Sequence, residues 1–277
     1  MRRKLSVSER RACRVLGQPR STQRYVGQKG EKDRILKERM LVLSRKHPRY
    51  GYRRVWALLR REGRMVNKKR VHRLWREEGL KVPDKQRKRR RLGESENGCT
   101  RKRATHPNHV WSYDFVMDRT EDGRRLKMMP IVDEYTRECL TIEVERSITA
   151  QDVASTLASL FRRRGEPAFI RSDNGPEFIA KAVKRWLEAS GVRTLYIEPG
   201  SPWENAYSEA FIGRFGDELL KREAFTELLE AKVLVEDYRE HYNQRRPHSA
   251  LGYRTPAEFA AAADLEVRLR IPGSQRS

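Results

Sequence analysis

The chain has 277 residues, which is long enough to bury a hydrophobic core without disulfides, so a small disulfide-stapled scaffold is excluded. It carries 61 lysines and arginines against 38 acidic residues, a net charge of +23, while 37% of its residues are apolar. It is therefore a folded and strongly basic protein. The sequence has no run of about 18 apolar residues, and its start turns polar where a signal peptide needs an apolar stretch. Membrane spanning and secretion are not expected.

The cysteines argue for a reducing compartment. Cys13, Cys99 and Cys139 are odd in number and contain no CxxC pair. They predict neither a disulfide framework nor a thiolate zinc site. We therefore expect a cytosolic protein.

The positive charge is confined to the first part of the chain. Residues 1–108 carry 36 basic and 10 acidic residues, net +26, whereas residues 109–277 carry 25 and 28, net −3. A segment with this much positive charge favours the binding of a polyanion, because each phosphate that it neutralises releases condensed counterions. Nucleic acid is the expected partner. The alternative is a solvated basic face, such as many ribosome-associated proteins carry.

Residues 1–46 predict short helices. Residues 6–26 have the pattern of two helices joined by a turn, in which Ser8 caps the first helix and Gly17 ends it. A third helix is expected over residues 31–45. Its apolar stripe consists of Ile35, Leu36, Met40 and Leu43.

Residues 47–82 predict a helix-turn-helix hairpin. The first helix presents one apolar face from Tyr52 to Leu59, and Asn67 caps the second helix. Five basic side chains lie near or on the second helix, as a DNA reader requires. The alternative is a basic hairpin that packs against another part of the protein. The expected DNA-contacting residues are Lys68, Lys69, Arg70, Arg73 and Arg76.

Residues 83–108 predict a basic linker. Like charges at this density repel one another, so the segment is expected to stay unfolded until phosphates screen it. We expect it to contact DNA. Its charged cluster consists of Lys85, Arg87, Lys88, Arg89, Arg90 and Arg91.

From His109 the hydrophobic period changes from 3.6 to 2. The runs HVWSYDFVMD, RLKMMPIVDEY and RECLTIEVERS predict a three-stranded antiparallel meander. A helix, the strand AFIRSD, a second helix and the strand RTLYIE follow, and two more helices close the chain, about 203–220 and 225–242. This order predicts an α/β domain over residues 109–265, a mixed five-stranded sheet flanked by helices, with a tail over 266–277.

Three carboxylates stand where helices and turns do not usually place them. Asp114 lies in the middle of the predicted strand WSYDFV, Asp173 ends another strand, and Glu209 lies on the helix after residues 199–202. Such groups can converge only if something offsets their mutual repulsion. A divalent cation does so, and hard oxygen ligands select Mg²⁺ or Mn²⁺.

These features resemble a known family. The segments SERRACRVLG, HPRYGYRRVWALLRREGRMVNKKRVHRLWREEGL, WSYDFV, SDNGPEF, ENAYSEAFIGRF and YNQRRPHSALGYRTPAEF occur in order, with 35 residues between Asp173 and Glu209. They are similar to the DDE transposases of bacterial insertion sequences, the orfB-type products of the IS-three family, whose catalytic domain is ribonuclease-H-like as in retroviral integrases. The resemblance covers nearly the whole chain.

The resemblance implies a catalytic triad of Asp114, Asp173 and Glu209. Asp114 would bridge two divalent ions, and Asp173 and Glu209 would each hold one, for cleavage of a phosphodiester followed by attack of the freed 3′-hydroxyl. The resemblance also implies double-stranded DNA as substrate, a homo-oligomer on DNA, and an upstream orfA-type product supplied separately or by fusion.

Other positions are less distinctive. Three residues that precede Glu209 on its helix are candidates for contact with a flipped or frayed base: Trp203, Asn205 and Tyr207. The alternative for Trp203 is a place in the core. Arg214 is either a phosphate contact or a surface arginine. His248 is more typical of a structural residue than of a catalytic one.

The sequence departs from the resemblance in two respects. It lacks the His/Cys spacing of a zinc module, and Gly216 stands where many relatives have Lys or Arg, seven residues after the glutamate. Two rival functions remain open: a non-catalytic DNA-binding regulator derived from such an element, and a structure-selective nuclease of the same fold.

Overall fold

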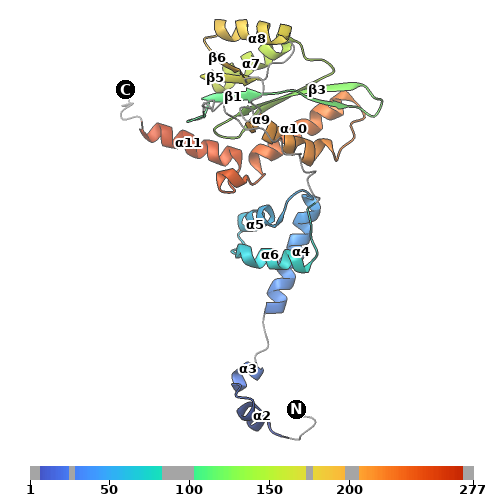
Figure 1. Cartoon of the computed structure of the whole chain (residues 1–277), viewed down its shortest axis with the longest axis vertical. Coiled ribbons are helices and arrows are strands. Elements are labelled where there is room, and N and C mark those ends of the chain that lie inside the picture. Colours follow the sequence, from blue (N-terminus) through green and yellow to red (C-terminus); the bar gives the residue numbers. More distant parts are fainter. Residues whose placement is uncertain (1–6, 25–28, 83–102, 173–176, 197–205, 271–277) are drawn as a thin grey trace, which may run out of the picture. The chain divides into compact units, whose positions relative to one another are not determined.

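The structure is a computed structural model that describes residues 7–24, 29–82, 103–172, 177–196 and 206–270. The chain divides into two compact units, Met1–Pro83 and Asp84–Ser277. Figure 1 shows the helices of the first unit and the sheet of the second. The predicted basic cluster from Lys85 to Arg91 lies outside the described residues.

The first unit is helical, as predicted. It contains α2 (Glu9–Val15), α3 (Arg20–Arg24), α4 (Lys29–Lys46), α5 (Tyr52–Arg61) and α6 (Lys68–Glu77). The Ser8 side chain accepts a hydrogen bond from the Arg11 N–H at the start of α2. Gly17 follows that helix with a φ of 63°, a conformation that glycine adopts without strain. Both the predicted cap and the predicted stop are confirmed.

Helices α4, α5 and α6 pack on one another around a single core. Met40, Val55, Leu59 and Leu74 are fully buried in it. The α4 stripe differs from the prediction at one position, since Ile35 is 44% exposed. The three other stripe residues already fill the α4 side of this core. At the start of α6 the Asn67 side chain accepts the Lys69 N–H at 2.8 Å, which confirms the predicted cap.

The second unit is built on a mixed sheet of six strands. They are β1 (Val110–Tyr113), β2 (Val116–Arg119), β3 (Arg125–Asp133), β4 (Cys139–Glu145), β5 (Phe169–Ser172) and β6 (Arg193–Tyr196). The order is β2-β3-β1-β5-β6, with β4 paired to β3; β1 and β5 pair in parallel, as do β5 and β6. The predicted count of five strands was wrong because the first predicted strand is divided in two.

The division falls at Asp114 and Phe115, and it leaves the register unchanged. Tyr113 lies opposite Ile131 and Val116 lies opposite Met128, so β1 and β2 follow the same side of β3. The Phe115 N–H is donated to the Asp114 carboxylate at 2.8 Å. A side-chain acceptor thus competes with the ladder for this N–H, which accounts for the interruption. The prediction that Asp114 lies within a strand is corrected: it directly follows β1.

Helices cover both faces of the sheet (Figure 1). On one face α7 (Ala150–Arg164) and α8 (Glu177–Ala189) pack over Trp111, Met129 and Ile170. On the other face α9 (Ala206–Phe215) and α10 (Leu228–Gln244) pack over Met128 and Val132. The alternation of side chains along β1 and β3 assigns successive residues to these two cores.

The C-terminal part contains more helix than predicted. After α9, the chain continues as a π-helical turn over Gly216–Leu220, and a 3₁₀ turn over Ser249–Leu251 precedes α11 (Pro256–Arg270). The sequence analysis missed α11. Its signal was the capping box of Thr255 and Glu258, in which the Glu258 N–H donates to the threonine hydroxyl and the glutamate accepts the Thr255 N–H.

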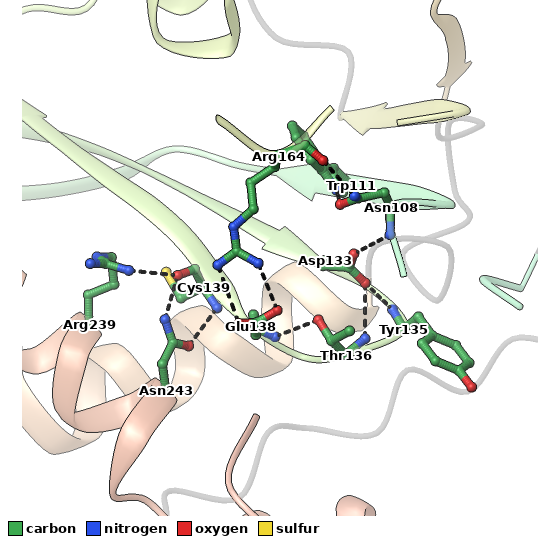
Figure 2. Close-up of polar contacts among 10 residues, drawn as sticks. All are labelled: Asn108, Trp111, Asp133, Tyr135, Thr136, Glu138, Cys139, Arg164, Arg239 and Asn243. Atoms are coloured by element: carbon green, nitrogen blue, oxygen red, sulfur yellow. Dashed lines mark hydrogen bonds and ion pairs between the residues drawn. The ribbon is translucent and has the colours of Figure 1, made fainter. Parts of the chain in front are cut away.

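A side chain of α10 forms hydrogen bonds with the backbone at the start of β4. The Asn243 amide accepts the Cys139 N–H at 2.9 Å and donates to the Cys139 carbonyl at 2.8 Å (Figure 2). Among the described strands, β4 pairs only with β3, which makes it an edge strand of the sheet. Among the helices that the structure describes, none is long and apolar enough to cross a membrane.

Candidate active site and nucleic-acid interface

Asp114 lies at the end of β1 on the face of the sheet that α9 covers. Ser112, two residues earlier, is buried and lies opposite Val132 of the α9 core, while Phe115 packs against the core on the other face. Since side chains alternate along a strand, Asp114 belongs to the α9 side. Its side chain is half-buried. The sheet thus presents this carboxylate at the carboxyl end of β1, under a helix.

Glu209 lies on that helix. α9 contacts β1 and β3 and buries Ser208, Phe211 and Phe215 against the sheet, while the Glu209 side chain is exposed. Within the described part of the chain, Glu209 makes no hydrogen bond or ion pair. An acidic side chain without a basic partner, in a chain with 61 lysines and arginines, remains available to a cation.

The third predicted carboxylate, Asp173, lies outside the described residues. The strand that leads to it is described: β5 ends at Ser172 and runs parallel to β1, with Ser112 opposite Arg171. In the described residues no group of three His, Cys, Asp or Glu side chains is placed to hold a metal ion.

A buried ion pair lies on the same face. The Arg171 guanidinium contacts the Glu134 carboxylate at 2.9 Å, and both side chains are at most 3% exposed. The Glu134 N–H donates to the Val110 carbonyl. This pair therefore connects β5, across β1, to the end of β3. Sequence reasoning missed it, because Arg171 looked like an ordinary strand residue.

Two of the arginines predicted to contact DNA form ion pairs within the first unit. Arg70 and Arg73 both contact the Asp33 carboxylate of α4, at 2.5 Å and 2.7 Å. The hydrogen bond from Arg73, with a smaller contribution from Arg70, lowers the pKa of Asp33. Arg73 also pairs with Glu77. These two arginines thus connect α6 to α4, a role that the sequence analysis did not anticipate.

The remaining basic residues of α6 are exposed. They are Lys68, Lys69 and Arg76. The Lys68 ammonium lies 5.6 Å from the centre of the Trp56 ring, against α5. His72, on the same helix, packs against Tyr52 with ring centres 4.3 Å apart. The exposed face of α6 is therefore basic and includes an aromatic pair contributed by both helices of the hairpin.

The structure also gives the surroundings of Arg214 and His248. The Arg214 guanidinium donates to the Ala210 carbonyl of its own helix at 2.8 Å. The His248 side chain is buried beside Tyr242, and the backbone N–H of His248 donates to the Arg254 carbonyl. Arg246, two residues earlier, forms a bidentate pair with Glu218 at 2.6 and 2.7 Å. The contacts of the segment around His248 are those of a buried structural cluster.

The integrase core domain family matches residues 104–202 and 190–256, and the HTH-like domain family matches residues 31–90. An uncharacterised 31.7 kDa protein of insertion element IS407 from Burkholderia multivorans is 42% identical over 261 residues, covering 94% of this chain and 93% of that protein. Transposase InsD of the IS2 insertion elements from Escherichia coli is 33% identical over 233 residues, 76% of this chain and 73% of that protein. The integrase catalytic core domain of HTLV-2, solved in complex with magnesium, has a TM-score of 0.46 and 16% identity, covering 57% of this chain and 99% of that chain.

The mixed sheet, the helices on both faces and the domain matches define a ribonuclease-H-like integrase core, preceded by a helix-turn-helix unit. The predicted fold class is confirmed apart from the strand count. The chain belongs to the family of insertion-element transposases that carry this core, which confirms the resemblance identified in the sequence.

Proposed function

We propose that this protein binds the ends of an insertion sequence and catalyses divalent-metal-dependent cleavage and transfer of DNA strands. The observation that carries the proposal is the placement of Asp114 and Glu209. Asp114 ends β1 on the side covered by α9, and α9, which contacts β1, carries Glu209. A strand and a helix that are far apart in sequence thus bring two carboxylates to one side of the sheet.

The donor chemistry fits Mg²⁺ or Mn²⁺. Carboxylate oxygens are the ligands that these hard cations prefer, and the exposure of Glu209 leaves its oxygens accessible. The residues that would hold two ions are Asp114, Asp173 and Glu209. When bound, such a pair of ions promotes in-line displacement at a phosphodiester by stabilising both the attacking and the leaving oxygen.

The protein's own residues would hold this site in place. The hydrophobic contacts of Phe211 and Phe215 hold α9 on the sheet, and the Arg171–Glu134 pair ties the strand that leads to Asp173 to the end of β3. Carboxylates on rigid elements keep their geometry as charge develops during the reaction, so no reorganisation is needed at that moment.

The first unit would hold the DNA. Its net positive charge and the exposed Lys68, Lys69 and Arg76 suit a duplex backbone, and the cluster from Lys85 to Arg91 would add phosphate contacts. The partners proposed are double-stranded DNA, further copies of this chain assembled on it, and an upstream orfA-type product or fusion. The site of action proposed is the bacterial cytoplasm, in association with the nucleoid.

One experiment separates this function from its rivals. Purified protein is incubated with a duplex carrying the element end, with Mg²⁺ or with EDTA, and the products are resolved on a denaturing gel. Joined strands that require Mg²⁺ support the proposal. Hydrolysis without joining would indicate a nuclease, and binding without cleavage would indicate a regulator. Glu166→Gln, which removes an exposed carboxylate between α7 and β5, is the matched control for Glu209→Gln.

A further inference from the structure

The turn between β3 and β4 holds Arg137 in a left-handed backbone conformation. Its φ is 66°, which an arginine adopts only at a cost of about 1–3 kcal/mol. The turn is fixed by Asp133, whose carboxylate accepts the Tyr135 and Thr136 N–H groups at 2.7 and 3.0 Å (Figure 2). The Arg137 N–H in turn donates to the Asp133 carbonyl.

Asp133 is itself anchored in the protein. It is 2% exposed and also accepts the Asn108 N–H at 2.7 Å. Burial raises the pKa of Asp133, while its backbone hydrogen bonds act in the opposite direction. The conformation of the turn is therefore determined by buried contacts, and the direction of the Arg137 side chain is set with it.

That side chain lies flat on an aromatic ring of α9. The Arg137 Cζ atom is 3.5 Å from the centre of the Tyr207 ring, on the first turn of the helix and two residues before Glu209. Other arginines near this turn have acidic partners: Arg164 pairs with Glu138, and Arg171 with Glu134. Among the described residues, Arg137 has no ion pair, and its Nη1 atom is buried without a hydrogen-bond partner.

In the isolated protein, this arrangement of Arg137 is unfavourable in free energy. A buried donor without a partner costs about 1–3 kcal/mol. The strained backbone adds to that cost, while a cation–π contact returns about 0.5–2 kcal/mol. The domain around it has more acidic than basic residues, 28 against 25, so acidic partners are not scarce. A guanidinium kept away from them, part-buried and flat on a ring, is preorganised for an anion from outside the chain.

We propose that Arg137, supported by Tyr207, binds one backbone phosphate of the DNA strand at the catalytic site. The inference rests on the proposed function, because it takes DNA as the ligand that reaches Glu209. A planar guanidinium matches the geometry of a phosphate, to which it can donate two parallel hydrogen bonds. Arg137 is thus a DNA-positioning residue contributed by the integrase core, in addition to the basic residues of the first unit.

The test measures the salt dependence of DNA binding by the full-length protein, without divalent metal. The affinity for an end-containing duplex is measured from about 50 to about 300 mM salt, where each phosphate contact contributes ~0.9 to the slope of log K against log salt. Arg137→Gln should reduce the slope by ~0.9. Arg162→Gln, which removes an exposed arginine from α7 on the other face of the sheet, should leave it unchanged.

Two further variants keep the proposal falsifiable if the turn is disturbed. Arg137→Lys retains the charge and should recover most of the slope, and Tyr207→Phe retains the ring and should match the wild-type protein. An Arg137→Gln variant with the wild-type slope would overturn the proposal, whether its melting temperature is unchanged or lower. Failure of the wild-type protein to cleave with Mg²⁺ would count against the proposed function instead, because the binding slope is measured without metal.

Discussion

Gly216 offers a test of whether the helix that carries Glu209 contacts DNA. It begins the π-helical turn that continues α9. A Cβ added at this position would meet no heavy atom of the described residues within 4 Å, leaving aside its own helix backbone and chain neighbours. Its φ is not positive, so the backbone does not require glycine. Gly216→Ala should therefore remove a helix-interior glycine penalty of about 1 kcal/mol. For a unit of this size, that gain corresponds to a rise in melting temperature of about 2–4 °C.

Gly216→Arg separates the charge from the helix effect. It should gain similar stability and also place a cation two residues from Arg214, on the helix of Glu209. If that cation reaches a phosphate, the slope of log K against log salt steepens by ~0.9 relative to Gly216→Ala. The assays are thermal unfolding and end binding by the full-length protein, followed by strand joining with Mg²⁺.

A single result would refute this reasoning. If Gly216→Ala folds with unchanged or raised melting temperature but loses end binding or joining, then glycine is needed because DNA or a second copy approaches the helix too closely for any side chain. In that case the open space around Gly216 belongs to a partner, and the arginine variant should lose activity as well.

Three further predictions follow from the site and from the first unit. Asp114→Asn, Asp173→Asn and Glu209→Gln should each lower the rates of cleavage and joining by thousands-fold, while DNA affinity and melting temperature stay unchanged. If a variant keeps more than about a tenth of the wild-type activity, the substituted residue does not belong to the site. A fragment of residues 1–108 should bind duplex DNA with a steep salt dependence and residues 109–277 far more weakly, a division that equal affinities would contradict. Because its arginine partners lower the pKa of Asp33, its contribution to stability is complete above its usual pKa and lost as pH falls through the lowered value. In urea unfolding at pH 7, Asp33→Asn should therefore be less stable than the wild type. On acidification the variant should lose less stability than the wild type does. An identical pH dependence of the two proteins would rule out this pairing.

Most of the fold followed from local signals in the sequence. Ser8 and Asn67 predicted helix starts because a short polar side chain can accept an orphan N–H, and each forms that hydrogen bond in the structure. The change of period at His109 predicted the change from helices to strands. α11 was missed although Thr255 and Glu258 carried the same kind of signal, because the run of alanines over 260–263 shows no amphipathic pattern.

The details of the site depended on contacts that sequence periodicity does not encode. The division of the first strand arises from one side-chain hydrogen bond of Asp114, which a hydrophobic pattern cannot show. Arg70 and Arg73 were assigned to DNA from their charge and their place on the second helix of the hairpin. Asp33, 37 and 40 residues away in sequence, contacts both. The conformation of Arg137 depends on a carboxylate buried at the end of the preceding strand. Charge and spacing in the sequence predicted which residues are candidates for the site. Tertiary contacts decide which of these side chains remain available to a ligand.

The amide of Asn243 has a consequence for how copies of this protein can meet. By bonding to both the N–H and the carbonyl of Cys139, it occupies the place of a neighbouring strand at the beginning of β4. An open edge can recruit an extended segment of another molecule, the first step of runaway strand pairing. Further along β4, Glu143 adds a negative charge to the strand, and Glu145 pairs with Lys232 of α10. Copies of this chain that assemble on DNA, as proposed above, could thus lie close together without their sheets pairing edge to edge.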